Sequence, residues 1–337
     1  MSETTLSWGL IGASDIAATR MIPALRRRGD AIVAVVSGDK DRATAFAAEN
    51  GIPLGSTDHN AALTHDVDAV YISNKNGQHF ESALRAIVAG KHVLCEKPLA
   101  LSVNEAQHLV DAATAAGVTF AVNHHLPGSG LHATTRRLVH EGAIGRVLSA
   151  RVHHAVQLPE RLRGWRIENV PGAGVVLDIT CHDASVLNPL LGTPVRVSAI
   201  GVTQAEWDTG DSVDAVMTVI EYRGPNGEKI IAQTHDAFTV AYSPTALEVQ
   251  GTRGSIRVLD AMTQDPTGTL LLTDVDGERE IELDSTEDLY TIILDNFHAA
   301  VDGTGSPTAT GQDGTLAVAV ALAVEESIRT ASTVQLA

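Results

Sequence analysis

Short apolar runs alternate with amphipathic stretches along the first third of the chain. Six apolar runs predict strands, and they lie at residues 6–12, 31–37, 53–56, 68–73, 91–97 and 118–123. Apolar residues at helical spacing predict helices at Asp15 to Arg28 and Gly77 to Ala89. Ser102 and Glu105 form a capping box that opens a third helix, ending near Gly117. This alternation predicts βαβ units around a parallel sheet that is buried on both faces.

The pattern changes after Asn123, where longer runs of alternating polarity follow one another with few helices between them. These runs predict an antiparallel sheet, with strands at residues 147–158, 194–203, 214–222, 229–240, 246–251, 255–260 and 269–275. Pro225-Asn226-Gly227 predicts a hairpin turn between the third and fourth of them. A helix is expected after Asp183, and two more between Leu289 and Thr330, separated by the segment DGTGSPTATGQDG.

The two patterns predict an α/β fold with two domains. An N-terminal Rossmann dinucleotide-binding domain is expected at residues 1–124, and a C-terminal α/β domain with a large, mostly antiparallel open sheet at residues 125–337. A chain of 337 residues is long enough for both cores. Whether the last helix packs on the first domain is left open.

Composition restricts the partners of the chain. The formal net charge of −17 disfavours nucleic acids and anionic membranes, so a small molecule is the expected partner. No apolar run approaches the roughly 20 residues that a membrane span needs, and the N-terminus lacks a signal-peptide pattern, which predicts a cytoplasmic protein. The two cysteines, Cys95 and Cys181, are expected to be reduced thiols.

The turn after the first predicted strand carries a degenerate dinucleotide-binding motif. Gly9 and Gly12 are followed by Ala13, Ser14 and Asp15, and an alanine replaces the third glycine of the usual pattern. Alone, this motif is also compatible with a tight turn that binds nothing. Its position between a strand and an amphipathic helix favours a pyrophosphate site at the helix N-terminus.

The end of the second predicted strand bears on the choice of cofactor. An NAD site usually has an acidic residue there for the ribose hydroxyls, whereas this chain has Ser37 and Gly38, with Arg42 further on. Ser37 and Arg42 can bind a 2′-phosphate, so NADP(H) is favoured. NAD(H) is the alternative, with Asp39 or Asp41 on the ribose.

Two further segments carry candidate chemistry. In the first, Glu96, Lys97 and Pro98 end a parallel strand, which would place a lysine beside the nicotinamide; a solvated strand-end lysine is the alternative. In the second, Asp178 and His182 are four residues apart, so that a helix would bring them to one face as an acid–base pair. A capping aspartate with a buried histidine is the structural alternative. No metal is expected, because nothing nearby completes a ligand set.

Together these motifs resemble the Gfo/Idh/MocA family of sugar and polyol oxidoreductases along essentially the whole chain, with EKP as the most specific mark. The resemblance implies that Lys97, Asp178 and His182 form the catalytic set. It implies a cofactor site of Gly9, Gly12, Ala13, Ser14, Asp15, Ile16, Ser37, Gly38, Arg42, Ser73, Asn74, Lys75, Asn76, Glu96, Lys97, Asn123, Trp165, Arg166 and Tyr290. Relatives often have three glycines where this chain has Gly172-Ala173-Gly174, and the added methyl group narrows the sugar pocket or has no effect.

The activity expected from this resemblance is NADP(H)-dependent reduction of a cyclic keto sugar such as 1,5-anhydro-D-fructose. Hydride passes from the nicotinamide to the ketone carbon, His182 donates the proton, Asp178 orients, and Lys97 polarises the carbonyl oxygen, although Lys97 and His182 can exchange roles. An inositol or pyranose dehydrogenase, and a noncatalytic NAD(P)-sensing regulator, are the alternatives. The resemblance also allows a homo-oligomer through the C-terminal sheet.

Other polar residues near these segments receive a plainer interpretation. His153, His154 and His235 with Asp236 lie in predicted strands and are expected to be structural. Either His124 or His125 can touch substrate. Cys95 and Cys181 adjoin the catalytic segments but are expected to be buried and inert.

Overall fold

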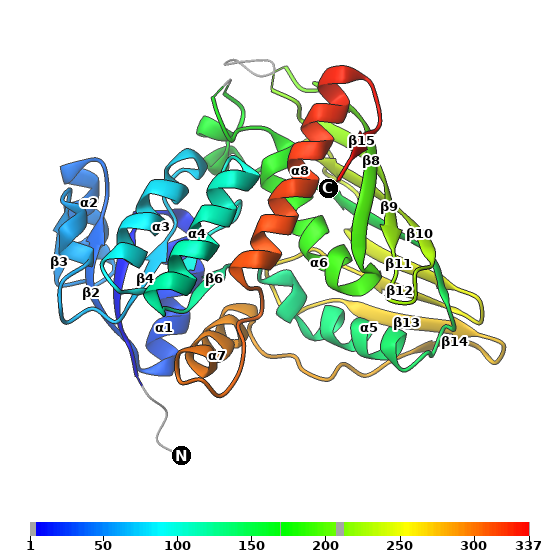
Figure 1. Cartoon of the computed structure of the whole chain (residues 1–337), viewed down its shortest axis with the longest axis horizontal. Coiled ribbons are helices and arrows are strands. Elements are labelled where there is room, and N and C mark those ends of the chain that lie inside the picture. Colours follow the sequence, from blue (N-terminus) through cyan, green and yellow to red (C-terminus); the bar gives the residue numbers. More distant parts are fainter. Residues whose placement is uncertain (1–4, 169, 207–211, 337) are drawn as a thin grey trace. The chain divides into compact units, whose positions relative to one another are not determined.

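The computed structural model of the chain describes residues 5–168, 170–206 and 212–336 (Figure 1). It divides into two compact units. Unit 1 comprises the chain up to His125 together with Tyr290–Thr315, and unit 2 comprises Leu126–Leu289 and the chain from Leu316 onward. The segment at 290–315 thus belongs to the first unit although it follows the second in sequence.

Unit 1 contains a parallel six-stranded sheet in the order β3-β2-β1-β4-β5-β6. The six predicted strands are all present, as β1 (Ser7–Ile11), β2 (Ala31–Val36), β3 (Leu54–Ser56), β4 (Ala69–Ile72), β5 (His92–Cys95) and β6 (Phe120–Val122). The strand order reverses between β1 and β4. In such sheets, ligands bind at the carboxyl ends of the strands beside this reversal.

The helices of unit 1 follow the predicted pattern closely. A π-helical turn (Ala17–Met21) continues into α1 (Ile22–Arg28), and a 3₁₀ turn (Asn76–Gln78) precedes α3 (His79–Val88). Ser102 caps α4 (Val103–Ala116) by accepting a hydrogen bond from the Glu105 N–H, and Gly117 ends the helix in a left-handed conformation. The helix α2 (Lys40–Glu49) was not predicted. A further 3₁₀ turn lies at His59–Ala62.

A buried polar cluster joins the start of the sheet in unit 1 to the helix α7 (Leu289–Val301). Trp8 is fully buried, its indole N–H donates to Asp30 Oδ2 over 3.1 Å, and its ring lies 5.3 Å from that of Phe297. His298 Nε2 lies 2.8 Å from the same Asp30 oxygen. Since the buried carboxylate has these partners, the cluster fixes α7 in unit 1 without an unpaired charge.

Unit 2 contains a nine-stranded, mostly antiparallel sheet in the order β14-β13-β12-β11-β7-β10-β9-β8-β15. The seven predicted strands are β7 (Val147–Ala155), β8 (Thr193–Val202), β9 (Ala215–Arg223), β10 (Lys229–Ala237), β11 (Ala246–Gly251), β12 (Ser255–Leu259) and β13 (Thr269–Asp274), to which β14 (Gly277–Glu280) and β15 (Val334–Gln335) are added. The predicted turn at 225–227 joins β9 to β10. The pair β7 and β10 is parallel, an exception to the expected antiparallel arrangement.

Helices cover one face of this sheet: α5 (Gly130–His140) and α6 (Cys181–Leu191) lie on the same side (Figure 1). The prediction of a helix after Asp183 starts too late, because helical structure begins with a π-helical turn at Val176–Thr180. The strands alternate buried and exposed residues, which leaves the opposite face of the sheet open. Short 3₁₀ turns lie at Leu126–Gly128, Glu160–Leu162 and Gly164–Arg166.

The last helix, α8 (Gly311–Thr330), begins inside the segment that was predicted to be a loop. Thr310 and Asp313 explain the early start, because the Thr310 hydroxyl accepts a hydrogen bond from the Asp313 N–H while the Asp313 carboxylate accepts one from the Thr310 N–H, as in a capping box. The division between the units falls within α8. Among the described residues, no helix combines the length and apolarity that a bilayer span requires.

Candidate active site

The predicted cofactor residues of unit 1 share one structural position. Gly12, Ser37, Ser73, Glu96 and Asn123 each come directly after the last residue of a strand, namely β1, β2, β4, β5 and β6. The backbone N–H of each still hydrogen-bonds to a carbonyl of a neighbouring strand or its extension, with N···O distances of 2.7 to 3.0 Å. The parallel sheet therefore carries all five to one edge, beside the strand reversal where ligands bind.

Gly12 has a conformation and surroundings that only glycine satisfies. Its φ is +124°, and a Cβ at this position would lie 2.5 Å from the backbone N of Asn74 and from the carbonyl carbon of Ser73. The turn after β1 is therefore pressed against the turn after β4. The helical segment that begins at Asp15 directs its N–H groups toward this turn.

Ser14 connects the two turns through its side chain. Its hydroxyl lies 2.8 Å from that of Ser73 and accepts a hydrogen bond from the Ala17 N–H. Gly9 is closed in by the backbone of Ala62, and Ala13 and Ile16 are half-buried, whereas Asp15 is exposed. The arrangement is a small-residue cradle at a helix N-terminus, which fits a pyrophosphate.

At the end of β2, a serine and an arginine face each other. Arg42 Nε donates to Ser37 Oγ over 2.8 Å, so the guanidinium lies at the strand end. Asp39 caps α2 by accepting a hydrogen bond from the Arg42 N–H, which engages its carboxylate with the helix terminus. Gly38 is exposed beside them. The donor set suits an anion better than a ribose hydroxyl.

Two buried amide oxygens in the same region suit a ligand that carries N–H donors. The Oδ1 atoms of Asn74 and Asn123 receive no hydrogen bond from the described residues, although Asn74 donates to Ser82 Oγ and Asn123 donates to Glu96. A buried acceptor without a donor is costly, so these oxygens fit a group that brings N–H donors, such as a carboxamide. Asn76 is also buried, and Lys75 is exposed.

Glu96 anchors the turn that carries Lys97. Its Oε1 accepts hydrogen bonds from the Tyr71 hydroxyl at 2.6 Å and the Asn123 amide at 2.5 Å. Burial raises the pKa of Glu96 above its ordinary value, although these hydrogen bonds and the nearby charge of Lys97 act in the opposite direction. Glu96 and Asn123 are thus buried supports of the turn, and Lys97 itself is half-buried.

His79 was not identified from the sequence, yet it joins the two central turns. Its Nδ1 lies 2.7 Å from the Pro98 carbonyl oxygen and its Nε2 lies 3.1 Å from the Asn74 carbonyl oxygen. Burial lowers the pKa of His79, and these contacts only partly offset the effect. The signal in the sequence is a histidine at the start of a helix with an apolar face, which does not distinguish a support from an ordinary core residue.

Two further histidines and a tyrosine lie near the end of β6 in unit 1. His124 is buried, and burial, with the charge of Lys97 as the second cause, lowers its pKa to about 3. His125 stacks on Tyr290, the first residue of the returning segment, with ring centroids 5.5 Å apart. The predicted residue Tyr290 is therefore buried in unit 1 beside the end of β6.

In unit 2, Asp178 and His182 lie on one continuous helical segment and are both 7% exposed. Asp178 belongs to the π-helical turn and His182 to the first turn of α6, so the simple α-helical spacing expected from the sequence is wrong in detail. Wider turns of this kind occur frequently at functional sites. Both predicted catalytic side chains are therefore buried in unit 2, on the helical segment that runs from the π-helical turn into α6.

Arg166 pairs directly with Asp178. Its Nε donates to Asp178 Oδ2 over 3.1 Å, while its guanidinium carbon lies 4.8 Å from the centre of the Trp165 ring. The ion pair is half-buried, and a neighbouring cation favours an ionised carboxylate. Arg166 therefore contacts a predicted catalytic residue, a role that the sequence did not suggest.

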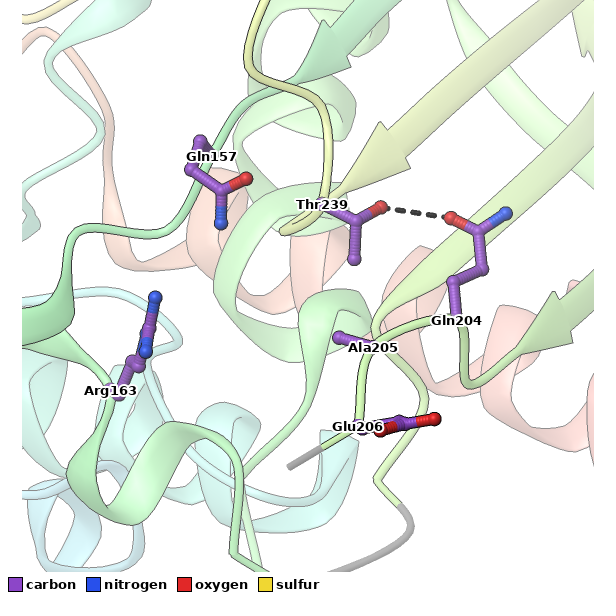
Figure 2. Close-up of a pocket in the computed structure, with 6 residues that line it drawn as sticks. All are labelled: Gln157, Arg163, Gln204, Ala205, Glu206 and Thr239. Atoms are coloured by element: carbon purple, nitrogen blue, oxygen red, sulfur yellow. Dashed lines mark hydrogen bonds between the residues drawn. The ribbon is translucent and has the colours of Figure 1, made fainter. Parts of the chain in front are cut away.

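A polar recess of about 400 Å³ lies elsewhere in unit 2, at the ends of β7, β8 and β10 (Figure 2). Figure 2 shows Gln204 and Thr239 joined by a hydrogen bond of 2.8 Å, with Gln157 and Arg163 on the other side. Ala205 and Glu206 also line it. None of the predicted site residues lines this recess. No group of three or more His, Cys, Asp or Glu side chains suited to a metal occurs among the described residues.

Comparison with known proteins identifies the family. Residues 6–124 match the oxidoreductase family with an NAD-binding Rossmann fold, and residues 132–257 match the GFO/IDH/MocA C-terminal domain. The chain is 44% identical over 326 residues to a 1,5-anhydro-D-fructose reductase of Ensifer adhaerens, covering 96% of each chain. It is 31% identical to D-xylose 1-dehydrogenase (NADP(+)) 2 of Haloferax volcanii, over 98% of this chain and 100% of the relative.

A solved structure shows the same fold over the full length. The aldose-aldose oxidoreductase of Caulobacter crescentus, complexed with glycerol, superimposes with a TM-score of 0.87 at 22% identity and covers 99% of this chain and 100% of its own. The predicted α/β architecture is thereby confirmed. From its two matched domains and its full-length relatives, the chain belongs to the Gfo/Idh/MocA family of oxidoreductases.

Proposed function

We propose that this protein is an NADP(H)-dependent reductase of a cyclic keto sugar, converting 1,5-anhydro-D-fructose to 1,5-anhydro-D-mannitol. The observation that carries the proposal is the combination of Lys97 at the end of β5 with the buried Asp178 and His182, in a chain that is 44% identical to a 1,5-anhydro-D-fructose reductase. The segments CEKP and LDITCHD hold these three residues. Sugar or polyol is the substrate class.

The preference for NADP(H) rests on the end of β2. Arg42 and Ser37 present donors there, while Asp39 is held at the cap of α2. A 2′-phosphate matches this arrangement, because guanidinium and hydroxyl donors bind phosphate oxygens. The Haloferax relative carries NADP(+) in its name. NAD(H) remains the alternative cofactor, since Asp39 and Asp41 lie nearby in sequence.

The proposed cofactor residues of unit 1 lie at its strand ends. The cradle around Gly12 takes the pyrophosphate, and Asn74 and Asn123 offer their buried oxygens to the carboxamide. The family resemblance alone assigns Trp165 and Arg166 to the cofactor as well. When bound, the nicotinamide supplies or accepts the hydride.

Side chains of the protein donate the proton that the reaction needs and stabilise the charge that develops on the carbonyl oxygen. His182 donates a proton to the oxygen of the reduced carbonyl, and Asp178, ion-paired with Arg166, orients His182 and the substrate hydroxyls. Lys97 stabilises the negative charge that develops on the carbonyl oxygen. Lys97 and His182 can exchange these two roles.

The proposal includes a cytoplasmic location and the association of two copies of the enzyme. Both cysteines are buried and neither forms a disulfide, which suits a reduced, cytoplasmic setting for a reductase that consumes NADPH. We also propose that two copies associate through the open face of the nine-stranded sheet. Ile200, Met217, Val219 and Ile231 are 76%, 53%, 49% and 57% exposed there, and such an apolar face favours a partner.

Two alternatives are separated by one set of rates. A dehydrogenase acting on an inositol or pyranose would share the catalytic residues, so initial rates are needed in both directions, with both cofactors and a panel of sugars. The proposal expects the highest kcat/KM for 1,5-anhydro-D-fructose with NADPH. A higher kcat/KM for oxidation of an inositol or pyranose with NAD⁺ would contradict it.

A noncatalytic NAD(P)-sensing regulator is the alternative of another class. It would bind cofactor with no turnover in the same panel. For an enzyme, Lys97→Ala and His182→Ala should each lose most of the turnover while NADPH binding survives. Near-normal turnover in either variant would remove that residue from the mechanism.

A further inference from the structure

A cluster of buried polar side chains, formed by Thr180, Asp183, His154 and Asp236, lies between α6 and the sheet of unit 2. Asp183, the residue after His182, is fully buried, and its Oδ1 lies 2.7 Å from His154 Nδ1 on β7. Asp236 on β10 is also fully buried and is the direct register partner of His154 in the parallel pair of strands. The Thr180 hydroxyl donates to Asp236 Oδ2 over 2.5 Å.

The two carboxyl groups need a proton between them. Asp183 Oδ2 and Asp236 Oδ1 receive no hydrogen bond from any N–H or hydroxyl group of the described residues, and the two carboxyl groups interact with each other. An ionised carboxylate is only an acceptor, so two of them in contact repel, whereas one proton satisfies both oxygens. Two buried aspartates in contact therefore hold one proton between them.

The surroundings decide which aspartate keeps the proton. Burial raises the pKa of Asp183 to about 7, and burial together with the charge of Asp183 raises the pKa of Asp236 well above its ordinary value. Asp183 has a histidine as its partner, whereas Asp236 has the hydroxyls of Thr180 and Thr234. Above neutral pH, the favoured state is thus a protonated Asp236 that donates to an ionised Asp183.

Among the described residues, other titratable groups near these buried side chains come from β9, α5 and α6. Tyr222 on β9 is buried near Asp183, and its hydroxyl donates to Asn188 Oδ1 over 3.0 Å. His132 on α5 is near His154, and burial lowers its pKa to about 4, so it is neutral above that pH. On α6, His182 has its ring centre 6.1 Å from that of His154.

We propose that Asp236 carries the shared proton, and that the resulting Asp183 carboxylate fixes His154 as a positioning residue which sets the orientation and proton affinity of His182. The carboxylate accepts the Nδ1–H of His154 and thereby determines its tautomer. Asp183 and His154 thus form a second acid–base pair behind Asp178 and His182. The effect on turnover rests on the proposed function, whereas the shared proton does not.

Asparagine variants of the two aspartates give opposite predictions. In Asp236→Asn the amide replaces the protonated carboxyl, donates to Asp183 and still accepts from Thr180, so kcat at pH 8 stays within about threefold of wild type. Asp183→Asn removes the carboxylate from His154, and kcat falls about tenfold to a hundredfold, the range seen when an outer-shell partner of a ligating histidine is lost. NADPH binding, measured by fluorescence titration, is unchanged in both.

The pH profile separates positioning from mere packing. Loss of a nearby negative charge makes it harder for an imidazole to hold a proton. In Asp183→Asn the alkaline limb of the kcat profile therefore moves to lower pH, while Asp236→Asn retains the wild-type limb. Equal losses of kcat in both variants, or an unmoved limb in Asp183→Asn, would overturn the positioning role.

Infrared spectroscopy of the whole protein tests the shared proton without any activity. At pH 8 the wild type should show a protonated-carboxyl stretching band that is absent from Asp236→Asn. If no such band exists, the shared proton is wrong, even where a variant fails to fold. If the band is present but no sugar is reduced, the proposed function fails and the acid pair stands.

Discussion

At the scale of single residues, Arg42 and Asp39 make different contacts at the end of β2. The carboxylate of Asp39 stabilises the start of α2, and the guanidinium of Arg42 remains beside Ser37. A charged hydrogen bond contributes about 1.5 to 3 kcal/mol, which corresponds to roughly tenfold to a hundredfold in affinity. We therefore expect Arg42→Ala to raise the KM for NADPH by at least about tenfold and to leave the KM for NADH nearly unchanged.

Lys40→Ala is the matched control for this change, because it removes a positive charge two residues away at the exposed start of α2. It should leave both KM values close to those of wild type. If Lys40→Ala and Arg42→Ala raise the KM for NADPH equally, the effect is one of general charge and the 2′-phosphate site is misplaced.

Ala13 is the second residue on which we expect cofactor choice to depend. It follows Gly12 in the pyrophosphate turn, where backbone approach is close, and it is half-buried. A methyl group in this turn restricts how the dinucleotide lies. Ala13→Gly should shift the ratio of kcat/KM for NADH to that for NADPH measurably, and an unchanged ratio would restrict Ala13 to packing.

The positions of the unit 1 residues could be predicted from the sequence because each follows an apolar run. A residue that ends a buried parallel strand lies at the ligand edge of the sheet, so Ser73 and Glu96 could be located without coordinates. Their partners could not be predicted. The contact between Glu96 and Tyr71 depends on which strands are neighbours, and the contacts of His79 depend on the path of two turns.

At the scale of elements, a helix that carries Asp178 and His182 was predicted, but the π-helical turn that alters their spacing was not. Nothing in VLDIT marks a π-helical turn, since such turns arise from tertiary packing more than from composition. The strands of unit 2 were predictable from their alternation. The parallel pairing of β7 and β10, which brings His154 beside Asp236, was not, because neighbours in a sheet need not be neighbours in sequence.

The helix α5 is tied to the chain after β12 by a buried histidine. His132 is 1% exposed, its Nε2 lies 2.8 Å from the Ala261 carbonyl oxygen, and burial lowers its pKa to about 4. The unfolded chain takes up a proton at this residue near pH 6.5, whereas the folded chain does not until about pH 4. The stability that depends on a neutral His132 is complete above pH 6.5 and is lost as the pH falls toward 4.

His132→Gln keeps a donor for Ala261 but cannot be protonated. The free energy of unfolding of wild type relative to this variant should therefore fall by about 2 kcal/mol between pH 7.5 and pH 5. Urea denaturation followed by circular dichroism at the two pH values measures the difference. A constant difference would show that His132 is protonated equally in the folded and unfolded chain.

At the scale of the whole molecule, the open face of the nine-stranded sheet is the proposed contact between copies. Met217 on β9 is the register partner of Ile200 on β8, Val219 lies two residues further along β9, and all three are about half exposed or more. A charge placed in the middle of a buried apolar contact is left without water or a partner. We expect wild type to sediment as a dimer or larger species, and Val219→Asp to shift it toward monomer in analytical ultracentrifugation.

Val275→Asp supplies the control, because Val275 is 95% exposed at the turn between β13 and β14 and does not lie on this face. It should sediment like wild type. A monomeric wild-type protein at the concentrations used for activity would contradict the proposed contact.

Isotope transfer tests directly whether this protein passes a hydride to the ketone carbon of a cyclic sugar. Purified protein would be supplied with 1,5-anhydro-D-fructose and with NADPH deuterated on the transferred face of nicotinamide C4. We expect 1,5-anhydro-D-mannitol that carries one deuterium at the former ketone carbon. His182→Ala should abolish, or nearly abolish, formation of this labelled product. Unlabelled product, or no product from a protein that binds NADPH, would contradict the proposed hydride transfer.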